Sequence, residues 1–78
     1  MKEYYVLIFR SETFVATPLI FTTMEKAKER MKKEYNDTLE DLKRMEQTPY
    51  TQYIDDAEAL IEASVDYEWT IEVCKIEE

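Results

Sequence analysis

The sequence predicts an α+β fold, in which a small antiparallel sheet packs one face against a single long amphipathic helix. Apolar residues recur every three or four positions between Met24 and Met45, as they do along one side of a helix. Segments rich in β-branched and aromatic residues precede and follow this stretch. The chain has 78 residues, which suit a single domain over residues 1–78.

Two extended segments come first. Residues 3–10 (EYYVLIFR) are apolar at both odd and even positions, which is typical of a strand in the interior of a sheet. Residues 14–20 form a second extended segment. Pro18 restricts this second segment to an edge or irregular strand, because proline has no amide hydrogen to donate.

The long helix is the clearest element of the sequence. Thr22 and Glu25 fit a capping box with Thr22 as the N-cap. No helix-breaking residue follows before Pro49, so we expect the helix to end at about Glu46. The residues of its apolar stripe are Met24, Ala27, Met31, Tyr35, Leu39, Leu42 and Met45.

Residues 53–64 allow two interpretations. Helical spacing is found at Ile54, Ala57, Leu60 and Ile61. Read with a period of two, the segment would instead form a strand over residues 57–63, with one face lined by Ala57, Ala59, Ile61 and Ala63. We prefer the strand, which gives the order β-β-α-β-β. A helix in this segment would instead give β-β-α-α-β.

The last predicted strand spans residues 67–76, where Trp69, Ile71 and Val73 alternate with less apolar residues. It would pair with the 57–63 strand across the turn at residues 64–66. We expect Trp69 to face the helical stripe at the centre of the core, because it is the largest apolar side chain of the alternating set.

The predicted helix is longer than the predicted sheet. About 24 helical residues span roughly 36 Å, whereas a strand of about eight residues spans only about 26 Å. Leu39, Leu42 and Met45 would therefore extend beyond the sheet. Two arrangements would cover them: the segment 47–56 folds back over them, or a second copy of the chain pairs with them in a homodimer.

Charge is unevenly distributed. Residues 1–33 hold seven basic and four acidic side chains, a net charge of +3, while residues 34–78 hold three basic and fourteen acidic side chains, a net charge of −11. A solvated acidic surface is the ordinary explanation. The sharper hypothesis is that Asp55, Asp56, Glu58 and Glu62 imitate nucleic-acid phosphates and occupy a basic groove on another protein. Direct nucleic-acid binding is not expected, because the basic cluster is small and opposed by the negative net charge.

The composition excludes several kinds of functional site. Glycine is absent, which excludes glycine-rich phosphate loops. Histidine is absent too, so neither a Cys–His catalytic pair nor a Cys2His2 zinc site can form. The run from Asp55 to Glu58 lacks the glycine and the alternating ligands of an EF-hand. The single cysteine, Cys74, is expected to be half-buried in a strand and unreactive. No catalytic residue, metal or cofactor is expected.

The pattern Phe21-Thr22-Thr23-x-Glu25-Lys26-Ala27, followed by Ala59-x-Ile61 and Trp69-x-Ile71, resembles small uncharacterised proteins of bacteria, phages and mobile elements. The resemblance covers most of the chain, but its residues are mainly helix caps and core positions. It therefore implies a fold and no activity.

From the sequence we expect a non-enzymatic accessory module that binds another protein or a second copy of itself. The alternative is an acidic nucleic-acid mimic that inhibits a DNA- or RNA-binding protein. The apolar run 4–9 is too short for a signal-peptide core or a membrane span, and a lone thiol agrees with a cytoplasmic location. The candidate interaction residues are Leu39, Leu42, Met45, Asp55, Asp56, Glu58 and Glu62.

Overall fold

The computed structural model describes residues 2–77, which form one helix and a six-stranded antiparallel sheet. The predicted α+β fold class is confirmed, with six strands where four were expected, because the segment 14–20 forms two short strands and β4 is additional. The elements in chain order are β1 (Lys2–Ser11), β2 (Phe14–Val15), β3 (Leu19–Phe21), α1 (Met24–Arg44), β4 (Thr51–Ile54), β5 (Glu58–Glu62) and β6 (Asp66–Ile76).

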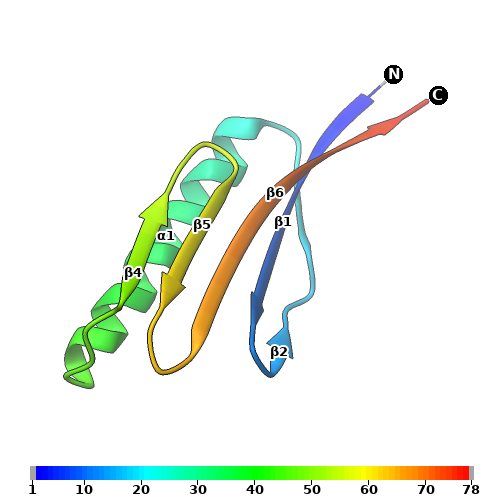
Figure 1. Cartoon of the computed structure of the whole chain (residues 1–78). Coiled ribbons are helices and arrows are strands. Elements are labelled where there is room, and N and C mark those ends of the chain that lie inside the picture. The colour runs from blue at the N-terminus through cyan, green and yellow to red at the C-terminus, as the bar shows by residue number, and fades with distance from the viewer. Residues whose placement is uncertain (1, 78) are drawn as a thin grey trace.

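The first and last strands lie side by side inside the sheet (Figure 1). The strand order is β2-β1-β6-β5-β4, and β3 also pairs with β1. The segment 14–20 is thus split into two short strands on either side of Pro18, both alongside β1. β1 and β6 pair from Lys2 opposite Ile76 to Ser11 opposite Tyr67, which confirms that the first strand is interior.

One end of the β1·β6 pair extends beyond the rest of the fold. β5 pairs only with residues 66–70 of β6, and β3 only with residues 5–7 of β1. The two long strands then continue together past the start of the helix, as the blue and red ribbons in Figure 1 show. The molecule is accordingly elongated, with extents of 49 × 23 × 16 Å. We call residues 2–6 of β1 together with residues 72–76 of β6 the β1–β6 arm.

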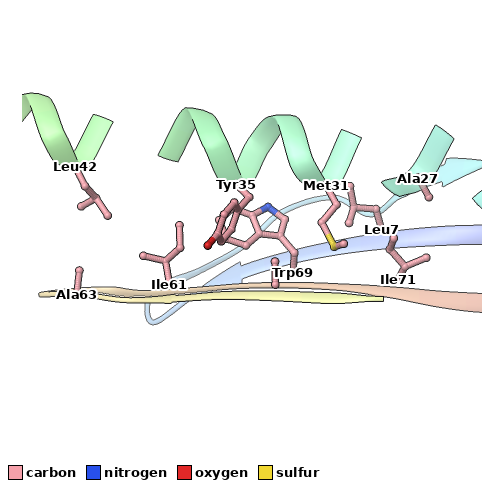
Figure 2. Close-up of a cluster of buried hydrophobic side chains, with 10 residues drawn as sticks. Leu7, Ala27, Met31, Tyr35, Leu42, Ile61, Ala63, Trp69 and Ile71 are labelled. Carbon is pink, nitrogen blue, oxygen red and sulfur yellow. The ribbon is translucent and has the colours of Figure 1, made fainter. Parts of the chain in front are cut away.

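The helix covers one face of the sheet, and the core lies between them (Figure 2). Alternate strand residues point to opposite faces, so Ile61, Trp69 and Ile71 share the face under α1, which we call the covered face. Trp69 is 1 % exposed, and its ring meets that of Tyr35 edge to face, with ring centroids 6.0 Å apart. The predicted place of Trp69 at the centre of the core is confirmed.

The helix begins one residue later than a Thr22 cap requires, so that prediction is wrong. Thr23 is the N-cap: its backbone is extended and its hydroxyl accepts a hydrogen bond from the Lys26 amide at 3.2 Å. Both threonines precede the apolar stripe, and the extended backbone of Thr23 (φ −134°, ψ 149°) is what aims its hydroxyl at the first turn.

The helix ends at Arg44, two residues before the predicted Glu46. Glu46 adopts a left-handed backbone with φ of 57°, a region that glycine enters most easily. The amides of Glu46 and Gln47 donate to the carbonyls of Lys43 and Leu42 at 3.1 and 2.9 Å. These two bonds are the Schellman motif, formed here with glutamate at the usual glycine position.

Residues 53–64 form strands, so the β-β-α-α-β alternative is wrong. Ala59, Ile61 and Ala63 are all buried on the covered face, as the period-two interpretation predicts. β5 pairs with β6 as the predicted hairpin, and β4 adds the unexpected strand on its other side. Burial of the period-two face under α1 therefore outweighs the helical propensity of alanine, glutamate and leucine.

Candidate interaction surface

The end of the helical stripe is covered by the chain's own sheet. Leu42 is 1 % exposed and, in Figure 2, lies above Ile61 and Ala63 of the β5–β6 hairpin. Leu39 is partly buried against the same core, and only Met45 remains exposed, at 56 %. The expected overhang of the helix is therefore wrong. Part of β6 (residues 72–76) lies past the start of the helix, so the cover over Leu42 comes from Ile61 of β5 and Ala63 in the turn after it.

The uncovered apolar surface lies instead on the other side of the sheet, which we call the open face. Its residues are recognised by the register, because directly paired residues share a face: Tyr4 pairs with Cys74, and Val6 with Ile20. Ile20 is 67 % exposed. We call the apolar side chains gathered here the apolar patch: Tyr4, Val6, Ile8, Ile20, Cys74 and Ile76.

The apolar patch is centred on the β1–β6 arm and contains a shallow groove of about 160 Å3. Tyr4, Val6, Ile20, Cys74 and Ile76 line it. Cys74 is exposed, which contradicts the expected half-buried thiol. The reason is that its even position in β6 points away from α1, toward the face that no element of residues 2–77 covers.

The four predicted acidic residues do not form one cluster. Asp55 and Asp56 lie in the turn between β4 and β5, whereas Glu58 and Glu62 lie at opposite ends of β5. The Asp55 carboxylate accepts hydrogen bonds from the amides of Ala57 and Glu58 at 3.1 and 3.0 Å, so it stabilises the turn. The Asp56 carboxylate lies 3.5 Å from the Lys28 ammonium.

Other carboxylates join Glu58 and Glu62 on the open face. Glu58 pairs with Thr70, and Glu62 with Asp66, so all even-numbered residues of β6 share their face. Glu68 and Glu72 therefore point the same way. We call this set the acidic half of the open face: Glu58, Glu62, Asp66, Glu68 and Glu72. Sequence reasoning missed the last three, because only the strand register brings β6 beside β5.

A second hollow, of about 290 Å3, lies between α1 and the segment that contains β2 and β3. Arg30 and Glu34 line it and form an ion pair of 2.7 Å. The indole nitrogen of Trp69 donates to the other Glu34 oxygen at 3.3 Å. Since these polar groups already satisfy one another, the hollow presents no unpaired charge to a ligand.

Three tyrosines have raised pKa values, each with a local cause. A hydrogen bond to Glu3 raises the pKa of Tyr5, and a hydrogen bond to Glu58 raises that of Tyr53. Burial between the helix and the sheet raises the pKa of Tyr35. Each shift favours the neutral phenol. Within residues 2–77 no group of three or more cysteine and acidic side chains is placed to hold a metal ion.

Comparison with protein-family models, curated proteins and solved structures finds no match for this chain. No helix in the described part of the chain is long and apolar enough to cross a membrane. The open face, with its apolar patch and its acidic half, is therefore the candidate functional surface that geometry alone identifies.

Proposed function

We propose that this chain is a non-enzymatic accessory module and that another protein docks on the open face of its sheet. The observation that carries the proposal is the apolar patch, six neighbouring side chains on a face that no element of residues 2–77 covers. Contiguous exposed apolar surface on a small domain marks a binding site more often than a scattered apolar residue does.

The surroundings of the apolar patch support the same proposal. The patch is bordered on one side by the carboxylates of the acidic half, which would favour a partner with apolar residues next to basic ones. A polar rim around an apolar centre is the ordinary anatomy of a protein interface.

The test is affinity capture from cell lysate with three versions of the chain. Ile20→Asp places a charge in the apolar patch at a residue that is 67 % exposed, so it should leave the fold intact. Tyr50→Asp is the matched control, because Tyr50 is 81 % exposed and lies in the loop before β4. We expect a protein that is retained by the wild type and by Tyr50→Asp but lost by Ile20→Asp. Identical capture by all three versions would overturn the proposal.

The second candidate function is an acidic mimic of nucleic acid that inhibits a DNA- or RNA-binding protein. The convergence of carboxylates in the acidic half favours it, since such a surface would attract a basic groove by the same salt-dependent attraction as a phosphate backbone. Neutralising Glu58, Glu62 and Glu68 to glutamine would then abolish capture of a basic protein, and capture would fall steeply from low to moderate salt. Capture that is insensitive to salt would argue against the mimic.

A further inference from the structure

We propose that the β1–β6 arm joins two copies of this chain, the open edge of one β6 pairing antiparallel with the same edge of the other, centred on Cys74. This inference rests on the proposed protein-binding function and names a second copy of the chain as a partner. It replaces the dimer through the helical stripe that the sequence suggests, because Leu42 is already buried within one chain.

The first support is an unused backbone edge. β5 accompanies β6 only as far as Thr70, with one more hydrogen bond from the Ile71 amide to the Ala57 carbonyl at 2.7 Å. Within residues 2–77 no strand continues along residues 72–76 on the side of β6 that faces away from β1. Backbone groups of alternate residues point to the same edge, so Val73 and Lys75 present theirs where Ile71 does. An open edge of this kind is a template for another strand.

Only one symmetric register uses this edge fully. Pairing centred on Val73 would place a second copy's strand on Ile71, whose amide is already bonded to Ala57. Pairing centred on Lys75 would set two like charges opposite each other, which is destabilising. Pairing centred on Cys74 sets Val73 opposite the second copy's Lys75 and Lys75 opposite its Val73. Val73 and Lys75 of both copies, the four residues whose backbone groups point to the open edges, then all take part in backbone hydrogen bonds.

The same register matches the side chains on both faces. On the open face each Cys74 lies between its own Tyr4 and the second copy's Cys74, so the two apolar patches become one surface. On the covered face the aliphatic stem of Lys75 lies beside the second copy's Val73, which is 53 % exposed in the single chain. The Lys75 ammonium already lies 3.7 Å from the Glu3 carboxylate, so the pairing buries no unpaired charge.

Charge explains why two copies would meet at the arm. The chain carries a net charge of −8, so two copies repel each other over most of their surface. In the arm the two lysines, Lys2 and Lys75, balance the two glutamates, Glu3 and Glu72, and its net charge is zero. A neutral arm is the region where like-charged molecules approach with the least repulsion, and it has no charge of its own to attract a basic partner.

The first test measures mass by sedimentation equilibrium across the micromolar range. A ladder this short buries less than the roughly 1,600 Å2 of a standard interface, so we expect a reversible dimer. The fitted mass should rise with concentration from 9.4 kDa toward twice that value. It should rise further with added salt, because salt screens the repulsion between the two acidic bodies.

Lys75→Pro is the variant that separates pairing from folding. The amide of Lys75 points to the open edge and not to β1, so proline removes an intermolecular hydrogen bond and leaves the β1·β6 ladder intact. Lys75→Gln keeps both the amide and the aliphatic stem. We expect Lys75→Pro to remain a monomer at every concentration and Lys75→Gln to dimerise like the wild type, with matching circular dichroism spectra.

The second test uses the natural cysteine of the wild-type chain. In the proposed register the two Cys74 residues form a non-hydrogen-bonded pair, with Cα atoms about 4.5 Å apart, inside the range of roughly 4.4–6.8 Å that a disulfide accepts. Mild oxidation with diamide, which takes up two electrons and two protons as two thiols form one disulfide, should therefore link two chains covalently. The control is Cys74→Ser combined with Val15→Cys, which moves the thiol to an exposed residue of β2.

A mass that stays at 9.4 kDa at the highest concentration, or equal cross-linking of the control, would overturn the dimer. Such a result would leave the proposed function standing if Ile20→Asp still lost a different captured protein. Conversely, a dimer together with unchanged capture by Ile20→Asp would refute docking on the open face and keep the inference. Weakening of self-association by salt would also contradict pairing through the β1–β6 arm, because an attraction between opposite charges would then be holding the copies together.

Discussion

The covered and open faces of the sheet use the same strands for opposite purposes. In β6 the odd residues Trp69 and Ile71 are buried under α1, while the even residues between and beside them point away from it. Every buried side chain of residues 2–77 belongs to α1, to the covered face or to the turn after β5, and none lies on the open face. One helix therefore stabilises the fold from one side, and no element of residues 2–77 covers the other.

The largest predicted effect tests the contrast between the covered face and the open face. Trp69→Ala should destabilise the fold by about 3–5 kcal/mol, because it removes the largest side chain of the core and leaves a cavity. Glu68→Gln, at the residue that precedes Trp69 in β6 but on the open face, should change stability by about 0.5 kcal/mol or less. Urea unfolding of both variants is the measurement. Equal losses would mean that both faces are structural.

Leu42 tests how far the covered face extends. Leu42→Ala should destabilise by about 3 kcal/mol, since this side chain is fully buried at the far end of the helix. Met45→Ala, one turn further on, should cost about 0.5 kcal/mol or less because Met45 is already exposed. Thermal or urea unfolding would compare them. A small loss for Leu42→Ala would mean that the helix end does not pack on the sheet.

The corrected cap tests where the helical cover begins. Thr23→Ala should destabilise by about 1 kcal/mol, because the Lys26 amide loses its side-chain acceptor. Thr22→Ala, which the capping-box pattern singles out, should have little effect. If the two losses were reversed in an unfolding experiment, the cap predicted from the sequence would be the right one.

A stabilising substitution is expected where the helical cover ends. Glu46→Gly should raise the free energy of unfolding by about 0.5–1 kcal/mol, since glycine relieves the left-handed backbone that glutamate holds at φ 57°. Glu46→Gln removes only the charge and keeps the β-carbon, so comparing the two by chemical denaturation separates backbone strain from electrostatics. Equal gains would assign the effect to the charge.

The smallest predicted effect tests the burial of Tyr35 at the covered face, through the pH dependence of stability. Burial raises the pKa of Tyr35 above its ordinary value of 10.0, so the folded state holds this proton more tightly than the unfolded chain. Its contribution to stability is therefore complete below pH 10 and is lost as the pH rises through the folded pKa. In urea unfolding measured between pH 10 and the raised folded pKa, Tyr35→Phe should lose stability less steeply with pH than the wild type. A slope unchanged from the wild type would contradict the assignment.

The fold could be predicted from the sequence where the chemistry is local and periodic. The stripe from Met24 to Met45 predicts the helix, and the alternation around Trp69 predicts both the last strand and its buried face. The period of two at Ala59 and Ile61 predicts the strand at 57–63, although the residue types favour a helix. These patterns depend only on which side chains must be buried together.

The candidate surface could not be predicted, because it depends on how distant strands are aligned. The apolar patch exists only because Val6 pairs with Ile20 and Tyr4 with Cys74, partners separated by 14 and 70 positions in the chain. The bounds of β1 and β6 were predicted to within one residue at each end, as residues 3–10 and 67–76, but nothing in the sequence shows that the two strands pair along their whole length. Sequence reasoning therefore placed the interface on the helix, while the register places exposed apolar surface on the sheet.

The pairing of β1 with β6 has a consequence for how the chain folds. The interior of the sheet cannot form until β6 meets β1, and the apolar stripe of α1 cannot be buried until Trp69 has been synthesised, 34 residues after Tyr35. Contacts between such distant segments slow folding, because a long loop must close before they stabilise anything. A ribosome-bound chain that ends before β6 would thus expose its amphipathic helix. We expect such a chain to need protection from aggregation until the last strand emerges.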